Sequence, residues 1–277
     1  MGLDASVMCN CFQKGKTTPP PVLREWLEID VEGYLNLKKE HDSDEDYMKL
    51  SKWSADCCPH PGLYQAQERI GNWASISMLK MALGKVGWEY FPVIDQELPQ
   101  GNGGITKPSQ SAKALRELAF FERQGVIGKT TVLVDSTTGK ELRKRVPSHN
   151  GIFLLNGSQK TDAGIGEFTF FVRDRETNAE LFNAPHVRQF SKNGKPITDQ
   201  NKTVIWEDPE TGQQVESTML VGGEPKKNLL GQTYYEFPAE FHVELRNQTA
   251  EDFRPVTDSL EAVFSASVQT GNPVRWC

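Results

Sequence analysis

The two halves of the chain differ in the spacing of their apolar positions. In residues 73–85, Trp73, Ile76 and Leu83 recur at the three-to-four spacing of one helix face. Similar signals predict helices near 47–53, 93–98 and 108–124. Apolar and polar residues instead alternate at 6–12 and 27–31, which predicts two strands. The first half, up to about residue 127, is therefore expected to lean towards helix.

After residue 129, short alternating runs are separated by turn residues. Pairs of such runs flank turns at 136–140, 174–178 and 208–212, and Asn193-Gly194 is a further turn dipeptide. An apolar stripe at 255–268 predicts a final helix. We therefore expect an α+β fold, with a helix-leaning N-terminal half packed on a mostly antiparallel, hairpin-rich C-terminal sheet. The parts are 1–127 and 128–277, unless they form one continuous domain.

Composition narrows the classes of protein. The 277 residues are 37% apolar and 25% charged, with a formal net charge of −6. This acidic balance argues against nucleic-acid binding by phosphate neutralisation. Because no apolar run approaches the roughly 18 residues that cross a bilayer and no signal peptide begins the chain, we expect a cytoplasmic protein without membrane contact.

Four of the five cysteines fall into two clusters about fifty residues apart, Cys9-Asn10-Cys11 and Cys57-Cys58-Pro59-His60. Thiolate and imidazole are the ligands that zinc prefers, and four of them complete a tetrahedral structural site. This pattern predicts a zinc site formed by Cys9, Cys11, Cys58 and His60. Prolines on both sides of His60 stiffen the second cluster and lower the entropy lost on ligation.

The expected strand geometry argues partly against this zinc site. Two thiolates on one zinc ion lie roughly 3.8 Å apart, whereas residues i and i+2 of a straight strand are nearly 7 Å apart. Cys9 and Cys11 could both bind zinc only if the strand bends or their side chains lean together. Two alternatives stay open: inert thiols in the core, or a reactive thiol.

A thiol enzyme would need a histidine within hydrogen-bonding reach of its cysteine and a group that orients that histidine. Cys58 with His149 or His186 is the available combination, with Asn150 or Asn183 as the orienting group. Both histidines are expected in loops, and no known catalytic motif contains them.

Without a catalytic motif, an acidic chain with many hairpins is typical of a protein that binds another macromolecule. The electrostatic field of an acidic protein favours a basic protein partner. Immunity, phage-conflict and assembly-component proteins are analogous classes. We therefore expect non-catalytic protein binding, with a cysteine–histidine hydrolase using Cys58 as the alternative. The tips of the three hairpins are the expected contact loops.

Overall fold

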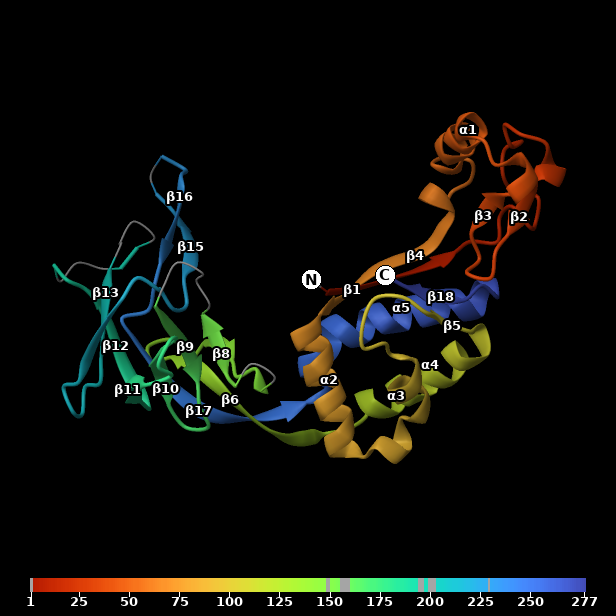
Figure 1. Ribbon diagram of the computed structural model, residues 1–277. Coiled ribbons are helices and arrows are strands. Elements are labelled where there is room, and N and C mark those ends of the chain that lie inside the picture. Colours follow the sequence, from red (N-terminus) through yellow and green to blue (C-terminus); the bar gives the residue numbers. More distant parts are fainter. Residues whose placement is uncertain (1, 148–149, 155–159, 194–196, 199–202, 229) are drawn as a thin grey trace. The chain divides into compact units, whose positions relative to one another are not determined.

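The computed structural model describes residues 2–147, 150–154, 160–193, 197–198, 203–228 and 230–277. The chain divides into two compact units (Figure 1). Unit 1 comprises Met1–Ile127 and Thr249–Cys277, and unit 2 comprises Gly128–Gln248. Gly194 of the predicted turn and His149 lie outside the described residues. Helices and antiparallel strands are both abundant, which confirms the α+β class.

Unit 1 is built on an antiparallel sheet whose strands run in the order β4-β1-β18-β5. The first and last strands of the chain are therefore neighbours, and backbone hydrogen bonds join Asp4 to Cys277 in both directions, at 3.0 and 2.8 Å. Residues 1–127 therefore combine strands with helices, and their expected lean towards helix stays a prediction. The sheet strands are β1 (Gly2–Met8), β4 (Tyr64–Asn72), β5 (Ile105–Thr106) and β18 (Val274–Trp276).

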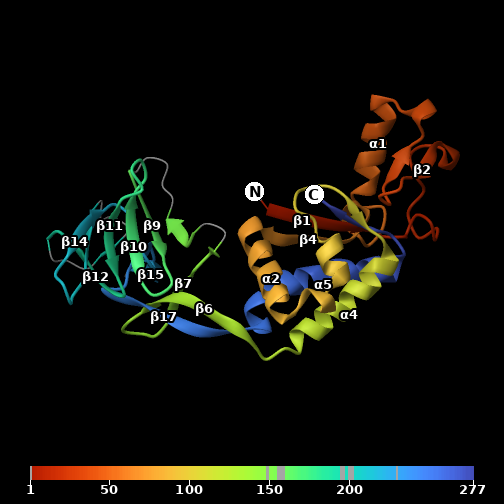
Figure 2. The ribbon, with the colours of Figure 1, turned by 60° about the horizontal axis from the view of Figure 1, so that its bottom comes forward.

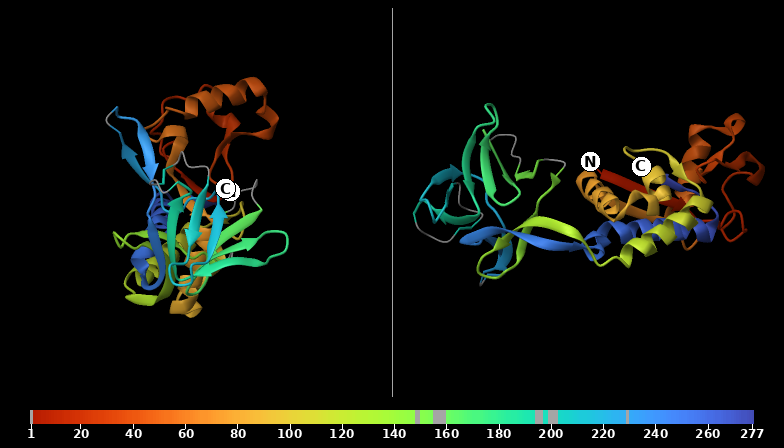
Figure 3. Two further views of the ribbon diagram at one scale, coloured as in Figure 1. Left: turned by 90° about the vertical axis from the view of Figure 1, so that its left-hand side faces the viewer. Right: turned by 90° about the horizontal axis from the view of Figure 1, so that it is seen from below.

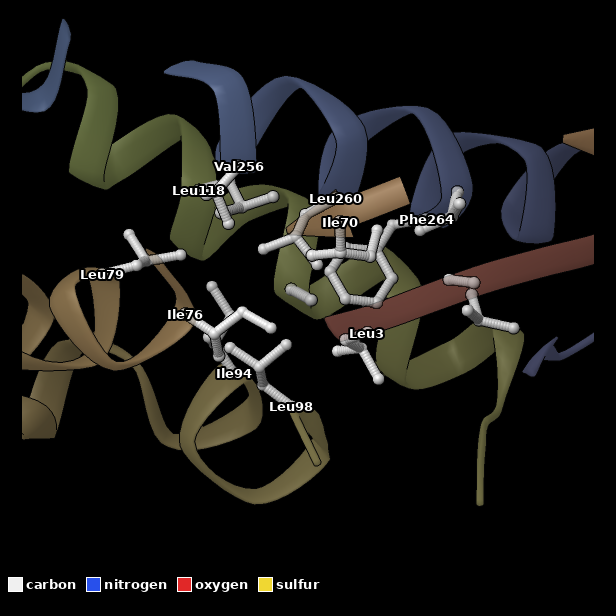
Figure 4. Close-up of a cluster of buried hydrophobic side chains, with 14 of the residues drawn as sticks. Leu3, Ile70, Ile76, Leu79, Ile94, Leu98, Leu118, Val256, Leu260 and Phe264 are labelled. Carbon is white, nitrogen blue, oxygen red and sulfur yellow. The ribbon is translucent and has the colours of Figure 1, made fainter. Parts of the chain in front are cut away.

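Helices cover one face of this sheet and enclose the core of unit 1 (Figures 2 and 4). Leu3 on β1 and Ile70 on β4 point into this core, where they meet Leu260 and Phe264. The rings of Phe264 and Trp276 of β18 meet edge to face, with their centroids 6.0 Å apart. The helices are α2 (Trp73–Val86), α3 (Pro92–Glu97), α4 (Pro108–Glu122) and α5 (Arg254–Thr270).

The C-terminal helix α5 belongs to unit 1, although the sequence places it with the hairpins. Its apolar stripe packs against α4 and β4, and the chain returns to unit 1 through a short 3-10 helix, η6 (Ala250–Phe253). The stripe was visible in the sequence, but a stripe does not identify the surface on which it packs. The chain first passes from unit 1 to unit 2 between Ile127 and Gly128.

Between β1 and β4 the chain forms an insert, residues 12–57, which lies beyond one end of these two strands (Figures 1 and 3). One small apolar cluster, around Phe12 and Leu50, lies within the insert, and a second, around Cys11 and Cys57, lies where the insert joins β1 and β4. On helix α1, Ser43 caps the N-terminus by accepting a hydrogen bond from the Asp46 N–H. The insert contains η1 (Arg24–Trp26), β2 (Leu27–Ile29), β3 (Leu35–Leu37), η2 (Lys39–His41) and α1 (Asp44–Ser54).

Unit 2 is formed by antiparallel strands, as the alternating runs predict. One sheet has the order β11-β10-β9-β8 and another the order β14-β13-β12-β17-β6-β7. The strands are β6 (Val126–Asp135), β7 (Glu141–Lys144), β8 (Ile152–Leu154), β9 (Thr161–Ile165), β10 (Phe170–Asp174), β11 (Glu180–Ala184), β12 (His186–Ser191), β13 (Val204–Glu207), β14 (Gln214–Ser217), β15 (Glu224–Lys227), β16 (Thr233–Glu236) and β17 (Glu240–Thr249).

A buried amide organises the core of unit 2. The Gln189 side-chain oxygen accepts hydrogen bonds from Trp206 Nε1 at 2.9 Å and from the Val221 N–H at 3.1 Å. Its side-chain nitrogen donates to the carbonyls of Val221 and Pro238. Because both ends of the amide are satisfied, Gln189 can remain buried beside Trp206 without leaving a polar group unpaired.

The three hairpin turns share one pattern, Asp-x-x-Thr followed by Gly or Asn. In each, the carboxylate of the first residue accepts hydrogen bonds from the turn, as Asp208 does from the Glu210 N–H and the Thr211 hydroxyl. The fifth residue has a positive φ of 57–72°, which Gly and Asn adopt most readily. The repeat comprises 135–139, 174–178 and 208–212.

Candidate metal centre

Antiparallel pairing of β1 with β4 brings the two cysteine clusters together. The last pair in this ladder is Met8 and Tyr64, and the Cys9 N–H donates a hydrogen bond of 2.7 Å to the Leu63 carbonyl just beyond it. Cys9 follows the end of β1, whereas His60 lies shortly before the start of β4. The two clusters therefore meet at the same end of the strand pair, where the insert begins and ends.

The strand predicted at 6–12 ends at Met8, so Cys9 and Cys11 do not lie on a straight strand. The spacing of a straight strand was the argument against both residues binding one zinc ion. From Asn10 the backbone turns, with hydrogen bonds from Lys14 N–H to the Asn10 carbonyl and from Lys16 N–H to the Cys11 carbonyl. The two thiols consequently do not have the spacing of a straight strand.

The second cluster lies in a tight turn that leads into η3 (Pro61–Leu63). Leu63 N–H donates to the His60 carbonyl at 2.9 Å. Leu63 also has a φ of +64°, a conformation that costs a non-glycine residue about 1–3 kcal/mol. This strained residue is the one that receives the hydrogen bond from Cys9, so the pairing of the two segments supports the turn.

The structure places the sulfur atoms of the three cysteines and Nδ1 of the histidine within 4.8 Å of one another. Cys9 Sγ lies 3.9 Å from Cys58 Sγ, which in turn lies 3.8 Å from His60 Nδ1. Cys11 Sγ and His60 Nδ1 are 3.3 Å apart. These four side chains, the ones predicted from sequence, could hold a metal ion.

Burial differs among the four side chains, and it raises the pKa of the Cys9 thiol. Cys9 and Cys11 are buried, whereas Cys58 and His60 are partly buried. Burial is the main cause that raises the pKa of the Cys9 thiol to about 12, and the nearby Cys58 and Cys11 thiols raise it further. A metal dication between these sulfur atoms would reverse this balance, because it stabilises thiolates directly.

The remaining cysteines are separate from this cluster. Cys57 is buried beside it, with Sγ 3.9 Å from the Ser54 carbonyl, and burial raises the pKa of its thiol to about 11. Cys277 is exposed at the end of β18, and all five cysteines are free thiols. The structure brings no other group of three or more His, Cys, Asp or Glu ligand atoms this close within the residues that it describes.

His186, one of the two histidines considered for a thiol enzyme, is not among the four clustered ligand residues. His186 was expected in a loop, but it begins β12 in unit 2 and pairs across the strands with His242. Its Nε2 lies 3.4 Å from a carboxylate oxygen of Glu240, and Asn183 is exposed on β11. Within the described residues, the imidazole close to Cys58 is that of His60.

Sequence reasoning missed β4 and therefore Tyr64, which borders the second cluster. A signal was present, because Tyr64, Ala66 and Ile70 are separated by polar residues at the spacing of a half-buried strand. The irregularity in the β1–β4 ladder between Leu3 and Asp4 interrupts that alternation.

Comparison of the chain with protein-family profiles, with curated proteins and with solved structures finds no match. Among the described residues, the helices are all too short or too polar to span a membrane.

Proposed function

We propose that the protein binds one zinc ion through Cys9, Cys11, Cys58 and His60. The observation that supports this most directly is the set of distances between the ligand atoms. Around a tetrahedral zinc ion, neighbouring sulfur atoms lie about 3.8 Å apart and a sulfur and a nitrogen about 3.6 Å apart. The separations of 3.9, 3.8 and 3.3 Å are close to those values.

The proposed ion is structural. Four protein ligands fill the tetrahedron, so no position is left for a water molecule or a substrate. The insert of residues 12–57 has one small apolar cluster of its own, and a second forms where it joins β1 and β4. Chain segments of this size commonly need a metal or a disulfide to fold. Zinc at the point where the insert begins and ends would supply that stabilisation.

For the protein as a whole, we propose non-catalytic binding to another protein, with a basic surface as the favoured partner. The acidic net charge supports this choice because complementary fields accelerate association. Free thiols throughout the chain suit a reducing compartment, and we propose the cytoplasm.

The alternative function is a cysteine–histidine hydrolase that uses Cys58. The contact between Cys58 Sγ and His60 Nδ1 favours it, since a nucleophilic thiol needs a nearby imidazole. Iodoacetamide separates the two functions. A nucleophilic Cys58 should be alkylated quickly at neutral pH, whereas a zinc-bound thiolate should be protected until the metal is removed.

The decisive experiment measures zinc per chain by elemental mass spectrometry, on untagged protein purified without chelator. We expect about one zinc per chain, with the metal lost in both Cys11→Ser and His60→Ala. Cys277→Ser is the matched control and should retain the ion, because Cys277 is not among the four ligands. A reduced, folded protein that contains no zinc would overturn the proposal.

A further inference from the structure

A cavity of about 220 Å³ lies between the insert and the ends of β1 and β4. Three segments form its walls: the end of β1 with the start of β4, the β2–β3 hairpin, and helix α1. Several wall residues lie within three positions of a proposed zinc ligand in the sequence. Met8 precedes Cys9, and Gly62 and Leu63 follow His60 by two and three positions.

The chemistry of the wall suits an aromatic side chain. Met8, Leu50 and Leu63 give the cavity apolar surface, and Tyr34 and Tyr64 meet edge to face with ring centroids 6.4 Å apart. Tyr47 of α1 also lines the cavity. We call this cavity, with Tyr34, Tyr47 and Tyr64 in its wall, the tyrosine pocket. Aromatic rings prefer such edge-to-face neighbours, which favours an aromatic occupant over an aliphatic one.

The outer part of the tyrosine pocket is open to solvent. Tyr47 is 57% exposed and its neighbour Met48 is 68% exposed. A half-open apolar pocket with an exposed aromatic rim is the form taken by sites that receive one anchor residue of a partner protein.

The segment that supplies the hairpin and helix walls of the pocket is acidic, and this charge favours basic residues in the partner. Residues 25–56 carry ten carboxylates and four lysines, an excess equal to the net charge of the entire chain. Asp44 lies one helical turn before Tyr47, on the same side of α1. The cation stacked on Tyr34 is Arg275, which is paired with Glu32 at 2.9 Å.

We propose that the tyrosine pocket takes one aromatic side chain from a partner protein, presented by a segment rich in lysine and arginine. This inference rests on the proposed binding function and gives it a location and a partner chemistry. Because the pocket walls converge on the proposed zinc ligands, binding also depends on the metal. Zinc removal releases the walls from one another and removes the pocket.

Short synthetic peptides test this inference on the full-length, zinc-loaded chain. The probe is a heptapeptide with a central phenylalanine between pairs of basic residues. One control replaces the phenylalanine with alanine, and another replaces the basic residues with glutamate. Binding is followed by NMR on isotope-labelled protein. We expect saturable shifts at residues 34–36, 47–54 and 62–64, and affinities at least about tenfold lower for both control peptides.

A pair of matched variants locates the site. Ser51 is an exposed pocket residue on α1, so Ser51→Trp should fill the mouth of the pocket and abolish the shifts. Ser265→Trp places the same side chain at an exposed position of α5 and should leave binding unchanged. Zinc content is measured in each sample, which separates loss of the pocket from loss of the fold.

Four results would overturn the inference. One is equal binding of the phenylalanine and alanine peptides, and another is unchanged binding by Ser51→Trp. The third is a dimer in sedimentation that Ser51→Trp converts to monomer while the peptide fails to bind, because the occupant would then be a second copy of the chain. If the protein contains zinc and none of the peptides binds, the pocket inference fails and the zinc site stands.

Discussion

The backbone N–H of Cys9 donates a hydrogen bond of 2.7 Å to the carbonyl of Leu63. This bond extends the β1–β4 ladder past its last residue pair and brings the two ends of a 46-residue insert together. Everything proposed for this protein depends on that closure. Cys9 is itself a proposed zinc ligand, and the other three lie between Cys9 and Leu63 in the chain. The tyrosine pocket includes residues on both sides of this hydrogen bond.

Removal of zinc should open the insert and leave unit 2 intact. Loss of a structural metal belongs with the most damaging changes, which cost more than about 4 kcal/mol. After dialysis against chelator, we therefore expect limited proteolysis to cut first within residues 12–57. Re-addition of zinc should restore resistance. An identical cleavage pattern with and without chelator would count against a structural role.

The core of unit 1 should be sensitive to truncation of Phe264. This side chain is buried against Trp276, and replacing a buried phenylalanine with alanine costs about 3–5 kcal/mol. We expect Phe264→Ala to lower the urea midpoint of the transition assigned to unit 1. Val268→Ala on the same helix is the control, because Val268 is 46% exposed. Similar midpoints for the two variants would contradict this packing.

In unit 2, Gln189→Leu should destabilise far more than its change in size implies. The substitution leaves Trp206 Nε1 and the Val221 N–H buried without acceptors, and each unsatisfied group costs about 1–3 kcal/mol. Gln214→Leu, at an exposed position of β14, should stay within about 0.5 kcal/mol of the wild type. Chemical denaturation of both variants, followed by circular dichroism, makes the comparison.

The turn at 208–212 should lose stability in acid. Hydrogen bonds from the Thr211 hydroxyl and the turn backbone hold the pKa of Asp208 below its usual value. A lowered carboxyl pKa stabilises the fold above the unfolded-state pKa of about 3.9, and this contribution disappears as the pH falls through the folded-state value. Asp208→Asn should therefore melt at a lower temperature than the wild type at pH 7. The two proteins should converge below about pH 3, and a constant difference across this range would refute the assignment.

The hairpins of unit 2 and the long helices were predictable because each is specified locally. Turn residues such as those at 174–178 mark a hairpin irrespective of its surroundings, and the apolar spacing in 73–85 marks a helix. The location of α5 was not predictable. Its stripe requires a partner surface, yet nothing in residues 255–268 identifies β4 and α4 as that surface. Strand β18 is too short, at three residues, to give a periodic signal.

The candidate site was predictable in composition and not in geometry. Scarce cysteines grouped in two clusters identified Cys9, Cys11, Cys58 and His60. Their convergence required β4, which sequence reasoning missed, and an early end to β1 at Met8. Both depend on strand pairing between residues about sixty positions apart, and local patterns do not report such pairing.

The side-by-side placement of β1 and β18 has a consequence for biosynthesis. The hydrophobic core of unit 1 needs α5 and β18, which leave the ribosome after unit 2, whereas unit 2 is continuous in sequence and is complete beforehand. During translation, the hairpins can therefore fold while β1, β4 and the helices α2–α4 still lack their partners. Throughout that interval the apolar side of β1 is not yet packed against α5. A chaperone that shields it would act on the nascent N-terminal segment.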